Sequence, residues 1–105
     1  MSAQQNQMPD LHDIDPMGMR ERVSNGSVLV IDDDEAVLGL LTDLLDLNGF
    51  SVQPARGGKE GLEHFDRSLP DLVITDIRMP QMDGLQVLKR VRKIDNTVPV
   101  ILVTG

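Results

Sequence analysis

Three aspartates that follow apolar runs are the residues of this chain best suited to chemistry. Asp32 and Asp33 directly follow the run Val28–Ile31, and Asp76 directly follows the run Leu72–Thr75. If both runs are parallel strands that end side by side, the three carboxylates meet at one edge of a sheet. Clustered carboxylates repel one another unless a positive charge lies among them, and Mg2+ is the usual hard cation that oxygen ligands hold. The sequence therefore predicts a Mg2+ site at this edge.

Part of this acidic cluster has a simpler structural explanation. Asp34 is placed to cap a helix that begins directly after it, and a carboxylate there also complements the helix dipole. Three adjacent acids exceed what one cap requires, so Asp32 and Asp33 remain free for another purpose.

Composition limits the classes of function that this chain can perform. The 105 residues suggest one small domain, and the net charge of -7 argues against a nucleic-acid surface within this segment. The absence of cysteine excludes disulfides and thiolate chemistry and fits a cytoplasmic protein. The apolar runs are far shorter than the ~20 residues of a membrane span, and the N-terminus lacks the features of a secretory signal.

Alternating strand and helix signals organise the rest of the chain. We expect strands over residues 27–31, 50–54, 71–75 and 98–103, and helices over residues 34–48, 58–67 and 84–93. This alternation predicts an α/β fold with a doubly wound parallel sheet and helices on both faces. Helical periodicity predicts these inward-facing residues: Val37, Leu38, Leu41, Leu44, Leu45, Leu62, Phe65, Leu85, Leu88 and Val91.

The two ends of the chain differ from its middle. Residues 1–26 are rich in Gln, Met, Asp and Asn with weak periodicity, so we expect a flexible leader with a short helical turn near Met17–Val23. The folded domain is then residues 27–105. The chain stops directly after the last expected strand, and a parallel sheet needs helices on both faces. We therefore expect this domain to be incomplete at its C-terminus.

Three segments carry a resemblance to a known family. Residues 28–35 (VLVIDDDE), 70–84 (PDLVITDIRMPQMDG) and 100–105 (VILVTG) together resemble the receiver domain of two-component response regulators. The resemblance extends from Ser27 to Gly105, and the last segment is similar to NtrC/DctD-like receivers in particular. It implies the flavodoxin-like (CheY-like) fold, with strands in the spatial order 2-1-3-4-5.

The resemblance also implies a role for each candidate site residue. Asp76 would be the phosphoacceptor, Asp33 would hold Mg2+ directly, and Asp32 would hold it mainly through water. The backbone carbonyl of Arg78 would complete the metal shell, and the Thr104 hydroxyl would contact the phosphoryl group. The protein would be a regulatory phosphoprotein rather than an enzyme. Its partner would be a sensor histidine kinase or a phosphotransfer protein.

The chain departs from the family pattern beyond its fourth expected strand. The family's Lys after a fifth strand has no counterpart, since the last lysine is Lys93. The fourth helix, fifth strand and fifth helix have no counterpart either. We therefore expect a marginally stable domain that accepts phosphate poorly and self-associates through the open edge of the strand at 98–103.

Two other functions are compatible with part of the pattern. A haloacid-dehalogenase-like phosphohydrolase would use Asp32 as nucleophile, Asp34 as acid/base and Thr104 in its second motif, but this interpretation leaves residues 76–84 unexplained. A degenerate, receiver-like interaction module would never take phosphate. Substituting Asp76 and Asp32 separately discriminates these hypotheses.

Overall fold

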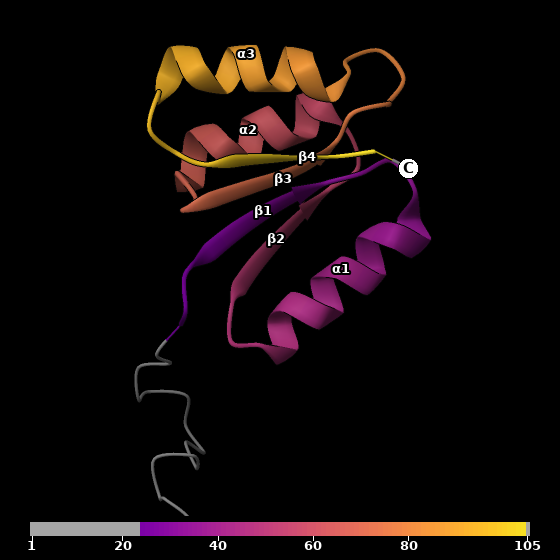
Figure 1. Ribbon diagram of the computed structural model, residues 1–105, viewed down its shortest axis with the longest axis vertical. Helices are drawn as coiled ribbons and strands as arrows, with labels where there is room; N and C mark the ends of the chain where they lie inside the picture. The colour runs from indigo at the N-terminus through magenta and orange to yellow at the C-terminus, as the bar shows by residue number, and fades with distance from the viewer. Residues whose placement is uncertain (1–23, 105) are drawn as a thin grey trace, which may run out of the picture.

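A computed structural model describes residues 24–104 of the chain, so the helical turn expected near residues 17–23 lies outside the described residues. The elements are β1 (Ser27–Ile31), α1 (Glu35–Leu47), β2 (Ser51–Ala55), α2 (Gly58–Ser68), β3 (Leu72–Asp76), α3 (Gly84–Ile94) and β4 (Val100–Val103). The strands form one parallel sheet in the order β2-β1-β3-β4. Helix α1 covers one face of the sheet, and α2 and α3 cover the other (Figure 1). The expected doubly wound, flavodoxin-like fold is confirmed.

The strand boundaries differ from the sequence-based expectation by one or two residues. β2 and β3 each lie one residue further along, which makes Asp76 the last residue of β3. β4 begins at Val100 rather than at residue 98. Pro99 has no N–H to donate to the ladder, although its carbonyl oxygen accepts a hydrogen bond from the Val73 N–H at 3.0 Å. Pro54 lies within β2, an edge strand, where a missing donor is tolerated.

β1 is the centre of the hydrophobic core because both of its faces are covered. Leu29 and Ile31 pack with Phe65 and the other buried residues on the side of α2 and α3. Val28 and Val30 face the other way and pack with Leu38 of α1. Alternate residues of a strand point to opposite faces, so a continuous apolar strand serves two layers. This packing holds the end of β1, and the acids that follow it, in one position.

Three of the residues expected to face inward are exposed. On α1, Leu38 is buried, but Val37 and Leu44 remain 37% and 49% exposed. Among residues 24–104, α1 is the sole helix on its face of the sheet, so its flank meets solvent. On α3 the expectation for Leu85 was also wrong, since that residue is 49% exposed and Val87 is fully buried. At 100° per residue, Leu85 lies about 200° around the helix from Val87.

Helices α1 and α3 each begin after an aspartate that caps them. The Asp34 carboxylate accepts hydrogen bonds from the N–H groups of Ala36 and Val37 at 2.9 and 3.3 Å. Asp83 forms a reciprocal capping box with Gln86 at the start of α3. No helix within the described part of the chain is long and apolar enough to cross a bilayer.

Candidate functional site

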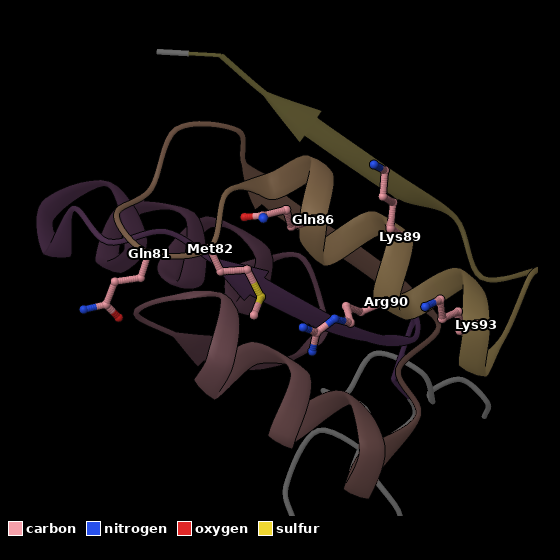
Figure 2. A pocket seen from close by; sticks show the side chains of 6 residues that line it. All are labelled: Gln81, Met82, Gln86, Lys89, Arg90 and Lys93. Atoms are coloured by element: carbon pink, nitrogen blue, oxygen red, sulfur yellow. The ribbon is translucent and has the colours of Figure 1, made fainter.

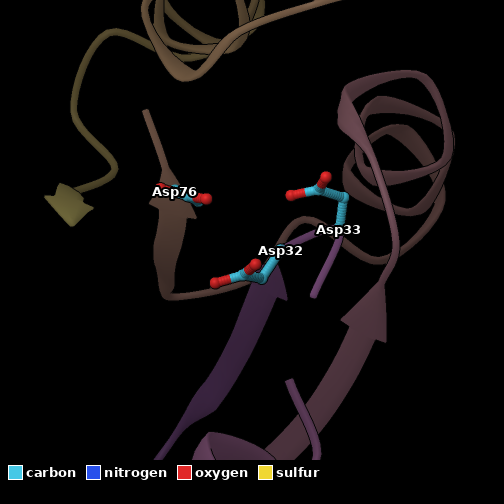
Figure 3. A group of neighbouring side chains, drawn as sticks. All are labelled: Asp32, Asp33 and Asp76. Atoms are coloured by element: carbon cyan, nitrogen blue, oxygen red, sulfur yellow. The ribbon is translucent and has the colours of Figure 1, made fainter. Parts of the chain in front are cut away.

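The end of β1 holds Asp32 in a fixed, buried position. Its N–H donates to the Ala55 carbonyl oxygen at 3.0 Å, which extends the pairing of β1 with β2 by one step. Its Oδ1 accepts the Asp34 N–H at 2.9 Å, and the residue is 6% exposed. A buried carboxylate with this hydrogen bond has little freedom to move. Asp33, by contrast, is exposed, and its carboxylate points toward Asp76 (Figure 3).

The end of β3 places Asp76 beside Asp32 and Asp33. Asp76 is half-buried and pairs in register with Val103 of β4. Its Oδ1 accepts a long hydrogen bond, 3.4 Å, from the Arg78 N–H, and the Thr75 hydroxyl donates to its carbonyl oxygen at 3.0 Å. The backbone on both sides of Asp76 is therefore held, while its carboxylate remains accessible.

The three carboxylates meet beyond the carboxyl ends of β1 and β3. One oxygen from each of Asp32, Asp33 and Asp76 lies within 4.8 Å of the other two (Figure 3). This separation is short for like charges, and three oxygen donors of this kind suit a hard divalent cation that keeps part of its water shell. The residues at this edge of the sheet therefore fit a Mg2+ site.

The electrostatics of the cluster agree with its geometry. Burial raises the pKa of Asp32 above its ordinary value of 3.8, and the neighbouring carboxylates of Asp76, Asp33 and Asp34 raise this pKa further. The hydrogen bond from the Asp34 N–H acts in the opposite direction and lowers the pKa. The net increase in the pKa of Asp32 means that the surroundings disfavour its ionised form. A bound cation would remove this penalty.

The other two predicted site residues lie at the same edge of the sheet. Thr104 is exposed and directly follows Val103, the register partner of Asp76. Arg78 is exposed and lies two residues after Asp76, in the loop that leads to α3. The fold thus brings the end of β4 to the acidic cluster, and Arg78 follows Asp76 directly in the chain.

Sequence reasoning missed the role of Gly84. It predicted only a turn and a helix start at Asp83 and Gly84. In the structure a Cβ at Gly84 would overlap the carbonyl oxygen of Asp76, so the start of α3 lies directly against the end of β3. The Gly84 N–H also donates to the Ile77 carbonyl oxygen at 2.8 Å. A glycine eight residues after an acid at a strand end was the available signal, but its meaning depends on the tertiary contact.

The fold and the acidic edge define an α/β module with a candidate cation site at the carboxyl ends of its parallel strands. A family model described as the response regulator receiver domain matches residues 28–105. The chain belongs to the family of response regulator receiver domains, which act in two-component signal transduction.

Curated relatives of this chain are bacterial regulators. The transcriptional regulatory protein PrrA of Mycobacterium leprae is 43% identical over 83 residues, which cover 79% of this chain and 36% of PrrA. The transcriptional regulatory protein GlrR of Escherichia coli is 43% identical over 78 residues, which cover 74% of this chain and 18% of GlrR. The chain thus spans about a third or less of the length of these relatives.

Solved structures agree with the family assignment. A response regulator receiver domain protein of Clostridium thermocellum is similar with a TM-score of 0.74 at 35% identity, covering 79% of this chain and 66% of that one. The response regulator protein TrrA of Thermotoga maritima, in complex with Mg2+–BeF, has a TM-score of 0.71 at 37% identity and covers 74% of this chain and 68% of TrrA. One of these two structures, that of TrrA, therefore contains magnesium.

The phosphohydrolase alternative loses its support at Asp34. That interpretation needs Asp34 as an acid/base, but the Asp34 carboxylate accepts two backbone N–H groups of α1. Together with the family match over residues 28–105, this contact assigns Asp34 a structural role.

Proposed function

We propose that this chain is a phosphorylation switch in which Asp76 accepts a phosphoryl group from the phosphohistidine of a sensor kinase or phosphotransfer protein. The observation that carries the proposal is the meeting of three carboxylates at the ends of β1 and β3, with Asp76 the accessible one at the end of β3. Asp32 is buried and held by the Asp34 N–H, so Asp76 is better placed to reach an incoming phosphorus atom.

The proposed transfer is a displacement at phosphorus. A carboxylate oxygen of Asp76 forms the new P–O bond while the P–N bond to the partner's imidazole breaks, and the imidazole leaves with the bonding electrons and takes up a proton. Bound Mg2+ would supply the positive charge that this approach of two anions requires. Asp33 would hold it directly, Asp32 mainly through water, and the Arg78 carbonyl would complete the protein's ligands.

Thr104 is proposed to read the phosphorylated state. Its exposed hydroxyl lies at the end of β4, one residue after the partner of Asp76, where it can donate to a phosphoryl oxygen. An inward shift of this residue would then change the surface of β4. The module would regulate a partner or an output domain rather than turn over a substrate.

The setting of this switch is proposed from the family and the chain together. We place it in the cytoplasm, where kinases and response regulators meet, with no nucleic-acid contact by this segment because of its net charge of -7. The relative GlrR supports a place near the NtrC-like receivers. We propose residues 27–105 as the receiver domain, with residues 1–26 as its leader. Asn25 joins the domain through hydrogen bonds to Asn48 and Gly49.

Acetyl phosphate with Mg2+ tests the proposal directly. Intact mass should show one added phosphoryl group that is stable in acid and labile in base, and Asp76→Asn should abolish it. Asp32→Asn should slow the uptake, but the phosphoryl group should still be found on Asp76. If Asp76→Asn takes up phosphate at the normal rate while Asp32→Asn does not, Asp32 is the nucleophile and the phosphohydrolase hypothesis is correct. Complete absence of uptake in the unaltered chain, as opposed to slow uptake, would support the interaction module that never takes phosphate.

A further inference from the structure

Two adjoining hollows form a groove over α2 and α3, and the loop before α3 borders both of them. The first, of about 370 Å3, is lined by Gln81, Met82, Gln86, Lys89, Arg90 and Lys93 (Figure 2). The second, of about 850 Å3, shares Gln81, Met82 and Arg90 with the first and continues to the start of α2. We call this surface the α2–α3 groove.

The groove gathers positive charge on an acidic protein. Five of the chain's 10 lysines and arginines line it, namely Arg56, Lys59, Lys89, Arg90 and Lys93. Arg56 pairs with Glu35 at 3.4 Å. Within residues 24–104, the other four have no carboxylate within ion-pair distance. Since the chain carries a net charge of -7, this concentration of cations is a local feature that its composition does not predict.

The floor of the groove is apolar and fixed in place. Met82 is half-buried, packs against the core and borders both hollows. The backbone of Gly58 lies so close that an added Cβ would be 2.8 Å from the Met82 sulfur, so the loop before α3 rests directly on the start of α2. Gln81, also in this loop, has a φ of 71°, which is unusual for a residue with a side chain. The shape of the groove therefore depends on the close packing of the Met82 side chain against the backbone of Gly58.

We propose that the α2–α3 groove is a docking surface for an acidic segment of a partner protein, in which an apolar side chain between carboxylates contacts Met82. The cations are distributed over two helices rather than converging on one point, which suits an extended ligand better than a small anion. On α3, Lys89 and Lys93 are four residues apart, so their Cβ atoms lie about 6 Å apart on the same side of the helix. Opposite charges across such a surface provide orientation and specificity.

A polypeptide fits this surface better than a nucleic acid does. Glu60 and Glu63 also line the larger hollow, where they repel a phosphate backbone of uniform charge, whereas a polypeptide can carry a basic or neutral residue opposite them. The net charge of -7 also opposes a polyanion of uniform charge.

The test is an NMR titration of the 15N-labelled 105-residue chain, without metal or phosphodonor. The probe is a 12-residue peptide of Glu-Glu-Leu repeats, and a Lys-Lys-Leu peptide of equal length is its control. We expect shift changes confined to residues 57–63 and 81–93, and weaker binding at high salt. Arg90→Gln should weaken binding up to about fivefold, as expected for one exposed ion pair. Arg67→Gln removes the same charge from α2 outside the groove and should bind normally.

Three results would overturn the proposal. They are no shift changes at millimolar peptide, shift changes of equal size at residues outside the groove, and equal weakening by Arg90→Gln and Arg67→Gln. Tighter binding of a 12-nucleotide single-stranded DNA than of the peptide would assign the groove to nucleic acid instead. A thermal melt of each variant shows that the fold is kept. The titration measures no phosphoryl transfer. A negative titration therefore does not bear on the proposed role of Asp76, and a negative phosphorylation experiment does not bear on the docking proposal.

Discussion

Three consecutive acids at the end of β1 lie in three different environments. Asp32 is buried and accepts the Asp34 N–H, Asp33 is exposed beside Asp76, and Asp34 caps α1. Their side chains are chemically identical, so the difference comes from the direction in which the backbone leaves the strand. A substitution at each position should therefore have a different consequence.

Asp32→Asn should stabilise the metal-free protein by on the order of 1 kcal/mol, because it removes a buried negative charge from among its neighbours and keeps an acceptor for the Asp34 N–H. The folded-state pKa of Asp32 is raised, so its charge opposes folding in full above that raised pKa. The penalty fades as the pH falls toward 3.8, the ordinary value. The advantage of the variant should therefore be largest near neutral pH and vanish in acid.

Urea melts between pH 3.5 and 7.5 measure this difference. Asp66→Asn, an exposed position on α2, removes the same charge outside the cluster and should change stability little. Adding Mg2+ should raise the melting temperature of the unaltered chain more than that of Asp32→Asn. An equal Mg2+ response in both would show that Asp32 takes no part in holding the cation.

At the scale of elements, the site depends on how closely α3 starts against the end of β3. Gly84 is buried, and the capping box of Asp83 and Gln86 fixes the first turn of the helix. The loop that connects the two elements contains Met79, which is 8% exposed and belongs to the core. Met82 of the same loop also packs against this core, so both methionines are packing residues.

Gly84→Ala should cost roughly 2–4 kcal/mol, since its Cβ would overlap the backbone oxygen of Asp76 and neither helix nor strand end can move freely. Gly39→Ala is the matched control, because a Cβ there meets nothing within 4 Å and α1 should gain up to ~1 kcal/mol. Denaturant unfolding of both variants measures the difference. A Gly84→Ala chain as stable as the unaltered one would show that the close approach of α3 to β3 is not required.

At the scale of the molecule, the sheet has a well-covered centre and a more open periphery. Among residues 24–104, β4 pairs with β3 alone, and its Ile101 and Val103 are 48% and 37% exposed. On the other face, the outer flank of α1 exposes Leu40 and Leu47. An edge strand with exposed apolar residues can pair with another copy of itself.

We therefore predict that the 105-residue chain self-associates through β4. Ile101→Lys should shift it toward the monomer, because a lysine on an edge strand opposes strand pairing. Leu47→Lys makes a similar exchange at a residue that is 81% exposed on α1 and should leave association unchanged. Sedimentation velocity over a range of concentrations measures both. If the unaltered chain stays monomeric at high concentration, or if Leu47→Lys has the larger effect, β4 is not the contact.

The amino-acid sequence by itself determined the order of elements, the fold class and the acids of the candidate site. Local signals were sufficient there: Asp34 does cap the start of α1, and Asp32 and Asp33 do follow β1. A parallel sheet then forces Asp76 toward them, because the strand ends of adjacent parallel strands share one edge. The roles of Arg78 and Thr104 remain predictions, although both residues lie near this edge.

Only the tertiary structure decided what depends on contacts between distant residues. Helical periodicity places Val37, Leu44 and Leu85 near an apolar stripe but cannot say which flank of that stripe has a partner. The burial of Asp32 beside the exposed Asp33 and Asp34 also depends on contacts between distant residues. So does the need for glycine at position 84. The α2–α3 groove brings together cations from two helices. The burial of a residue and its distance from other residues are properties of the packed chain. A sequence pattern predicts them only where local structure, such as a helix cap or a strand end, determines them.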